Sequence, residues 1–257
     1  MAMIEAPSSG ATAPAISEVD RLVIAELHKL EETANRTFEW LYDIIAPALG
    51  SSILEVGSGV GVISKFLVAR GQPVILTDHQ QSYLDYLQMR FGDAPHISRR
   101  VLDLTSSHYD LGGRVVDTVV CVNVLEHLQD DRRVLRAMRE VLAPGGTLIL
   151  QVPNYPALYG SLDEVYGHFR RYTRAMLTER LSEAGFRIIW MRNFNPLGIP
   201  GWFVSAKILR AQQINVNALR LYNLLVPLAR RLDFLSHFGG LGLIACARSP
   251  AREDRTS

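Results

Sequence analysis

The chain has 257 residues, of which 48% are hydrophobic and 21% charged, and its formal net charge is +1. This length and apolar content suit one large α/β domain with a sizeable core, and the near-neutral charge does not favour nucleic-acid binding. The two cysteines stand inside apolar runs, which indicates buried thiols rather than a disulfide, and no metal site is expected. No signal sequence and no apolar run near the ~20 residues of a membrane span are evident, so a cytoplasmic protein is expected.

Composition and periodicity predict the limits of the folded domain. Residues 1–17 are rich in Ala, Pro and Ser and are expected to form a disordered tail, with a second tail over 249–257. The folded domain is expected to span residues 18–248. Its first part, residues 18–48, has the apolar periodicity of helices. We expect this segment to cover a site formed by the strands that follow it.

Residues 52–62 carry the strongest functional signal and read SILEVGSGVGV. An apolar strand over 53–56, a glycine-rich turn and the start of a helix together form a site for a polar ligand. The dinucleotide fingerprint G-x-G-x-x-G would need glycine at position 62, where this chain has Val62. Glu55, two residues before the first glycine, would repel a pyrophosphate and attract an ammonium group.

Strands and helices alternate after this loop. Strands are predicted over residues 73–77, 97–101, 116–122, 147–152, 186–193 and 241–247, and helices over 80–91, 131–142 and 173–184. Such alternation indicates a parallel sheet with helices on both faces, which binds ligands at the carboxyl ends of its strands. Asp78 ends the second strand 21 residues after Gly57, where a carboxylate accepts hydrogen bonds from both ribose hydroxyls of a nucleotide-like ligand.

Five features in this order resemble the motifs of class I S-adenosylmethionine-dependent methyltransferases. They are EVGSGVG at 55–61, Asp78, Asp103, NVLEHL at 123–128 and LAPGG at 142–146. The resemblance implies a Rossmann-like α/β fold with a seven-stranded, mostly parallel sheet in the order 3-2-1-4-5-7-6 and helices on both faces. It also implies that S-adenosyl-L-methionine is the cofactor and S-adenosyl-L-homocysteine the product. A NAD(P)-dependent oxidoreductase and a non-catalytic cofactor-binding protein on the same fold are the alternatives.

The same resemblance assigns the cofactor contacts. The residue at Asp103 accepts from the adenine amino group in the family, and the backbone N–H of Leu104 would face the ring. In the family, the first residues of the motif at 123–128 line the methionine moiety. For Glu126 and His127, which follow them, a structural role is expected at least as much as a chemical one. The full set of expected contacts is Glu55, Gly57, Ser58, Gly59, Gly61, Asp78, His79, Asp103, Leu104, Asn123 and Val124.

The loop after the fifth strand, residues 152–172, is where an acceptor would meet the methyl group, and it is rich in aromatic and ionisable residues. If the acceptor is a hydroxyl, His168 is the first choice for general base, with Asp163 and Tyr166 as second choices. The alternative is that these groups form a structural polar network. Contacts with the acceptor are predicted for Tyr159, Arg170, Arg171 and Tyr172, because paired arginines suit a carboxylate or phosphate.

The second half of the chain is similar to a bacterial subgroup of these methyltransferases that is often found near polyprenyl-phosphate glycosyltransferases. This implies O- or N-methylation of a small-molecule or lipid-linked acceptor by direct in-line transfer. An insert over residues 195–238 has helical patterns around 207–213 and 217–235. It is a lid, a contact in a homodimer or a peripheral membrane patch at the inner membrane face; alternatively, it is a helical pair with its apolar side in the core. Seven bases without any acid lie between Glu183 and Asp233: Arg187, Arg192, Lys207, Arg210, Arg220, Arg230 and Arg231.

Overall fold

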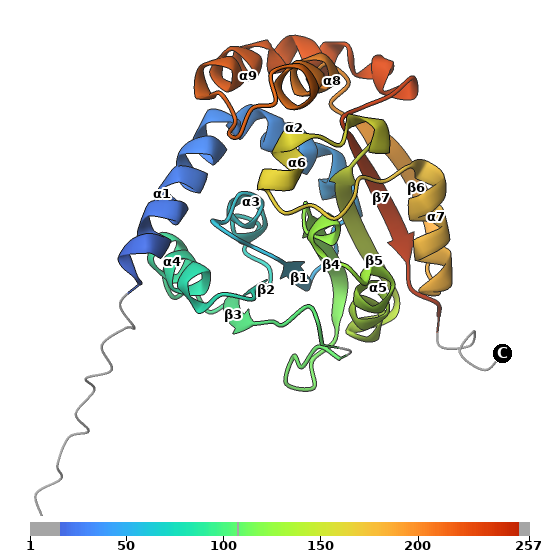
Figure 1. Ribbon diagram of the computed structural model, residues 1–257. Coiled ribbons are helices and arrows are strands. Elements are labelled where there is room, and N and C mark those ends of the chain that lie inside the picture. Colours follow the sequence, from blue (N-terminus) through green and yellow to red (C-terminus); the bar gives the residue numbers. More distant parts are fainter. Residues whose placement is uncertain (1–15, 107, 252–257) are drawn as a thin grey trace, which may run out of the picture.

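The computed structural model describes residues 16–106 and 108–251, and its centre is one seven-stranded sheet (Figure 1). The strand order is β3-β2-β1-β4-β5-β7-β6, so the order predicted from the family resemblance is confirmed. All pairs are parallel except those of β7 with β5 and β6. The strands are β1 Ile53–Val56, β2 Val74–Asp78, β3 Ile97–Val101, β4 Val116–Val122, β5 Leu142–Pro153, β6 Arg187–Phe194 and β7 Gly242–Arg248.

Helices cover both faces of the sheet, and each face has its own apolar core. Successive side chains of a strand point to opposite faces, so in β1 Ile53 belongs to one core, and Leu54 and Val56 to the other. Helices α5 and α7 pack on the second of these cores, whereas α2, α3, α4 and α9 pack on the first. The helices are α1 Glu18–Thr33, α2 Asn35–Ile45, α3 Ser64–Val68, α4 Gln81–Phe91, α5 Asp131–Glu140, α6 Ser161–Val165, α7 Arg174–Glu183, α8 Gly198–Phe203 and α9 Val216–Arg231.

The insert over 195–238 is helical, but its first predicted helix was placed wrongly. Helix α8 and the π-helical turn Val204–Ile208 overlap the predicted segment 207–213 only at residues 207 and 208, and α9 begins at Val216. The reason is local, because Arg210 has a φ of 48° and a left-handed residue ends a helix. Asn215 then starts α9 by accepting hydrogen bonds from the N–H groups of Asn217 and Ala218. In Figure 1, α6, α8 and α9 lie over the edge where the parallel strands end.

The two predicted tails lie mostly outside the described residues. Residues 1–15 and 252–257 lie outside the described residues. Ser17, by contrast, belongs to the folded part, because its hydroxyl accepts from the N–H of Asp20 and caps α1. At the other end, Ser249 and Pro250 still bond the backbone of Gly146 and Gly145, beyond the end of β7. Among the helices of residues 16–106 and 108–251, none is both long and apolar enough to cross a membrane.

Candidate functional site

The glycine loop after β1 is held in a conformation that requires glycine. Gly57, Gly59 and Gly61 have φ angles of 71°, 50° and 87°. A Cβ atom at Gly57 would lie 2.5 Å from Cγ2 of Val124, and one at Gly61 would lie 2.8 Å from Cδ2 of Leu87. A Cβ atom at Gly59 would meet nothing within 4 Å. Gly57 and Gly61 therefore let the loop pack against the protein, whereas Gly59 faces open space.

That open space is a cleft of about 430 Å³ at the carboxyl edge of the sheet. Its floor is the glycine loop together with Glu55 and the end of β4 at Val122 and Asn123. Its other walls come from α1, α2 and the insert, so the N-terminal helices cover the site as expected. The cleft residues from these walls are Leu27, Leu30, Glu31, Ala34, Phe38, Ile214 and Leu219.

Glu55 lies under the loop and is buried. Its Oε2 accepts hydrogen bonds from the hydroxyls of Ser58, at 2.9 Å, and Ser64. Burial raises the pKa of Glu55 to about 7, against the opposing effect of these two hydroxyls. Ser58 also ties the loop to β2, because its N–H donates to the carbonyl of Thr77 at 2.7 Å. The predicted contact Glu55 is thus a carboxylate whose ionised form a nearby cation would favour.

Asp78, at the end of β2, faces the same loop. Its Oδ2 accepts from the N–H of Gly59 at 2.9 Å and its Oδ1 from the N–H of Gln80 at 3.2 Å. Only 6% of Asp78 is exposed, whereas the neighbouring His79 is largely exposed, with Nδ1 at 3.1 Å from Oδ1. The position beside Gly59 suits the predicted contact with ribose hydroxyls, which stays a prediction.

The other predicted cofactor residues follow β3 and β4. The Oδ1 of Asp103 accepts from the N–H and the hydroxyl of Thr105 at 2.8 and 2.7 Å, and these bonds lower the pKa of Asp103. Leu104 packs against the core. Asn123 adopts a φ of 52°, and its N–H donates to the carbonyl of Gln151, which turns the chain sharply at the end of β4. Val124, the next residue, is the side chain that fills the space beside Gly57.

In the loop after β5, Asp163 and His168 form a hydrogen-bonded pair. Oδ1 of Asp163 lies 2.8 Å from Nδ1 of His168 and 2.8 Å from Nε of Arg171, and its Oδ2 accepts from the N–H of Gly160. Asp163 is fully buried, and the His168 side chain is 11% exposed. Asp163 can therefore not meet an acceptor as a base and instead orients the His168 ring. Tyr159 donates from its hydroxyl to the carbonyl of His168, which fixes the same loop.

The prediction that Arg171 and Tyr172 contact the acceptor is wrong, because both side chains are buried in the fold. The Arg171 side chain is 1% exposed, donates to the carbonyl of Asn154, and lies 4.4 Å from the ring centre of Trp202. Tyr172 is 0% exposed and donates to Asp131. Arg170 is also engaged, in an ion pair of 2.9 Å with the same Asp131. Arg171 and Tyr172 thus stabilise the loop, whereas the acceptor contact of Arg170, whose side chain is 23% exposed, stays a prediction.

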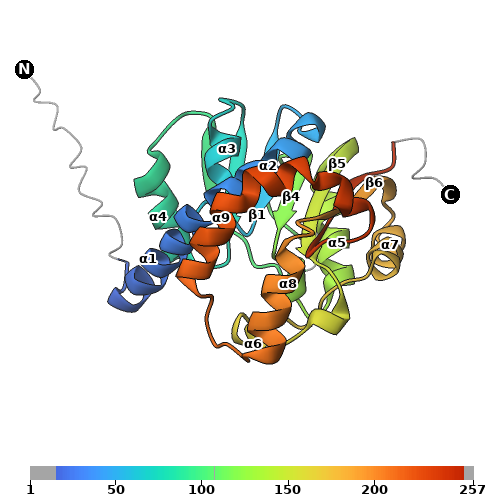
Figure 2. The same cartoon turned by 90° about the horizontal axis from the view of Figure 1, so that it is seen from above.

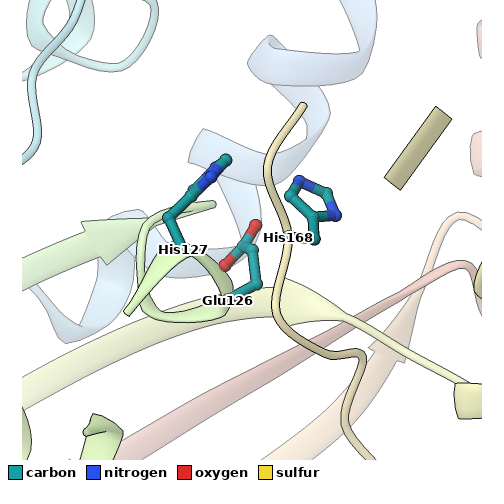
Figure 3. Close-up of side chains that lie close together, drawn as sticks. All are labelled: Glu126, His127 and His168. Carbon is teal, nitrogen blue, oxygen red and sulfur yellow. The ribbon is translucent and has the colours of Figure 1, made fainter. Parts of the chain in front are cut away.

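One group of side chains was not identified as a site from the sequence. Figure 3 shows Glu126 and His127, from the short helical turn Leu125–His127 after β4, beside His168 from the loop before α7. The rings of His127 and His168 are 4.7 Å apart between centres and nearly perpendicular. Both carboxylate oxygens of Glu126 are buried without a hydrogen-bond partner among the described residues. The adjacent acid and histidine in NVLEHL were the only sequence signal for this group.

Comparisons with known proteins agree with this geometry. Residues 18–190 match the family model described as a methyltransferase domain. A probable S-adenosylmethionine-dependent methyltransferase of Mycolicibacterium smegmatis is 29% identical over 156 residues, which cover 60% of this chain and 59% of the relative. A ubiquinone biosynthesis O-methyltransferase of Pseudomonas paraeruginosa is 28% identical over 156 residues, covering 54% of this chain and 66% of the relative. Each match thus spans less than two thirds of the relative.

The fold is also found among solved structures. An S-adenosylmethionine-dependent methyltransferase from Mesorhizobium loti superposes with a TM-score of 0.58 at 14% sequence identity. The superposition covers 80% of this chain and 96% of that structure. At this identity the likeness concerns the fold alone.

Proposed function

The chain belongs to the methyltransferase domain family and uses S-adenosylmethionine, and we propose that it methylates a hydroxyl group of a lipid-linked acceptor at a membrane surface. In direct in-line transfer the acceptor oxygen would bond to the methyl carbon of the bound cofactor, the hydroxyl proton would be released, and S-adenosylhomocysteine would be the product. Placing the two reactants correctly supplies several kcal/mol of the rate enhancement. Family membership replaces the NAD(P)-dependent oxidoreductase considered from the sequence.

We place the cofactor in the cleft above the glycine loop. Because Gly59 has no side chain, the ligand can approach its backbone closely. The N–H of Gly59 donates to Asp78, which fixes the position of the loop. The carboxylate of Asp78 retains acceptor capacity for ribose hydroxyls. Glu55 supplies negative charge below the loop for the amino-acid end of the cofactor. The cofactor supplies an electrophilic methyl group, and this chain supplies the shape and charge that hold it.

Two glycines provide a matched test of this placement. Gly59 and Gly71 both have positive φ, 50° and 69°, and neither would have an atom within 4 Å of an added Cβ. Gly59→Ala and Gly71→Ala should therefore each cost the fold about 1 kcal/mol of strain. Only Gly59 lines the cleft, so we expect only Gly59→Ala to weaken S-adenosylmethionine binding, by about tenfold or more, in calorimetric titration. Equal affinities for the two variants would place the cofactor elsewhere.

A second cleft offers a route for the acceptor. It has a volume of about 440 Å³ and shares Leu30 and Ile214 with the cofactor cleft. Tyr166 lines it, and the ring of His168 is 6.4 Å from that of Tyr166. We therefore place the acceptor hydroxyl beside His168, whose ring Asp163 orients. The remaining walls of this cleft come from α1 and from the insert, including Ser205, Leu209 and Asn215.

The observation that carries the membrane proposal is the apolar surface of the insert. Helix α9 buries only Val226 and Ala229, so most of its apolar residues do not pack in the core. Figure 2 shows α8 and α9 uncovered on this side of the molecule. Ten of the nineteen large hydrophobic residues that are exposed in the described structure belong to this segment. They are Phe203, Val204, Ile208, Leu209, Leu221, Leu224, Leu225, Leu228, Phe234 and Phe238.

Positive charges accompany this apolar surface. Arg230 pairs with Asp43, and Arg192 pairs with Asp233. Within the described ranges, Lys207, Arg210, Arg220 and Arg231 have no acidic partner. Exposed leucines and phenylalanines between unpaired bases are typical of surfaces that bind anionic lipid headgroups. Because the insert also lines both clefts, a lipid-linked acceptor could enter the second cleft directly from such a surface.

We expect the protein to sediment with vesicles that contain anionic phospholipid, and less so as salt rises, since exposed charges are screened within ~8 Å at physiological ionic strength. Leu221→Asp with Leu224→Asp should weaken this binding by about tenfold or more. Both side chains are more than 60% exposed, so the fold should tolerate the changes. Met89→Asp with Val115→Asp, at 69% and 60% exposed positions outside the insert, is the matched control.

The acceptor itself is tested by turnover. We expect S-adenosylhomocysteine to form with lipid extracts of bacterial cells and not with aqueous extracts. A protein that stays in the supernatant at low salt, and that turns over with the aqueous extract, would instead have a soluble small-molecule acceptor.

A further inference from the structure

The side chains of Glu126, His127 and His168 form a group of the composition that binds transition metals. Each residue offers one ligand atom, and these atoms all lie within 4.8 Å of one another. Two imidazoles with one carboxylate are a recurrent ligand set for divalent metals, and they leave positions open for other ligands. Glu126 and His127 follow Asn123, which lines the cofactor cleft, by three and four residues.

Glu126 is the strongest indication that a positive charge belongs at this point. Its side chain is 0% exposed, and neither oxygen has a hydrogen-bond donor within residues 16–106 and 108–251. A buried carboxylate without a partner costs the fold several kcal/mol, unless it is protonated or bound by a cation. The nearby guanidinium of Arg171 is already paired with Asp163. Glu126 is therefore a buried acid that has no ion-pair partner among the described residues.

The histidines are arranged as ligands usually are. Metal-binding histidines commonly donate their second ring nitrogen to a carboxylate, which fixes the ring and the tautomer. Asp163 accepts from Nδ1 of His168 in this way at 2.8 Å, and Arg171 and the N–H of Gly160 hold Asp163 in place. Figure 3 shows the other nitrogen of His168 on the side of His127.

We propose that Glu126, His127 and His168 bind one divalent transition-metal cation, with Asp163 as the positioning residue for His168. The binding site stands on its own geometry, whereas its role rests on the proposed function. An acceptor hydroxyl at an open position of the cation would lose its proton to solvent more readily, because coordination lowers the pKa of a bound oxygen. The oxygen would then form its bond to the methyl carbon as the carbon–sulfur bond breaks. His168 would act as a ligand in this scheme rather than as a general base.

The test uses the full chain, stripped with a chelator and titrated with Zn²⁺ and with Co²⁺ in the absence of cofactor and acceptor. We expect one equivalent to bind with a Kd of about 1 μM or lower, and bound Co²⁺ to show the visible absorption of a nitrogen-ligated site. Glu126→Gln and His168→Ala should each weaken binding by about a hundredfold or more. Glu126→Gln keeps the shape of the side chain, so it should fold even if His168→Ala does not.

His108→Ala is the matched control, because His108 is exposed and pairs with Glu140 outside the group. It should leave metal binding unchanged. The proposal is overturned if neither cation binds, or if the Glu126 and His168 variants bind as the unaltered chain does. Binding of S-adenosylmethionine, measured on the same samples, reports separately on the methyltransferase site, so the two proposals fail independently.

Discussion

Replacing Asp163 with alanine is expected to lower the free energy of unfolding by about 3–5 kcal/mol, because it leaves a buried guanidinium without its counter-charge. The Arg171 side chain is 1% exposed, and its Nε lies 2.8 Å from Oδ1 of Asp163. The same substitution also removes the hydrogen-bond partner of His168. Urea unfolding, followed by circular dichroism and by tryptophan fluorescence, measures the loss.

A double variant separates this charge effect from lost packing. Asp163→Ala combined with Arg171→Met removes both charges while retaining an unbranched side chain against Trp202. We expect it to be more stable than Asp163→Ala alone, since no unpaired charge then stays buried. If Asp163→Ala unfolded at the same urea concentration as the unaltered chain, the pair would be free to serve a ligand and our structural assignment of Arg171 would be wrong.

Asp78→Ala is expected to weaken S-adenosylmethionine binding at least tenfold, through loss of two ribose hydrogen bonds worth on the order of 1.5–3 kcal/mol together. Asp78 is 6% exposed and already aligns the N–H of Gly59, so the loop loses a fixed point as well. Calorimetric titration measures the change. Asp85→Ala is the control, because the Asp85 side chain accepts from Gln81 on α4 and, unlike Asp78, has no hydrogen bond to the glycine loop among the described residues.

An Asp78 variant that folds normally and binds with unchanged affinity would remove this residue from the ribose site. The thermal midpoint without cofactor decides whether a weaker variant is merely less stable. Comparison with Asp85→Ala then shows how much of the change comes from charge alone.

Local patterns in the sequence predicted the sheet well. The apolar run over 53–56 and the glycines behind it specify β1 and its loop, because a strand buried on both faces and a positive φ leave direct traces in residue type. The order of the strands came from the family resemblance rather than from such patterns. The position of Asp78 beside the loop could be predicted because parallel strands end at the same edge of a sheet.

The acceptor side could not be predicted in the same way, because it depends on contacts between distant residues. Glu126 and His168 are 42 positions apart, and nothing local in either segment indicates that they meet. Likewise, the sequence predicts that an arginine in a loop is exposed to solvent, whereas Arg171 is buried between Asp163 and Trp202. The periodicity of α9 indicated one apolar side, but it could not show that little of that side is covered.

The position of β7 has a consequence for synthesis. This strand pairs with β5 on one side and β6 on the other, although it follows both in the chain. The 47 residues between Phe194 and Gly242 take roughly 2–10 s to translate at typical rates of synthesis. Until β7 is made, the edges of β5 and β6 with which it pairs have no partner strand. Unpaired strand edges associate readily with other chains, so we expect the unfinished protein to be prone to aggregation at this stage and to be bound by chaperones.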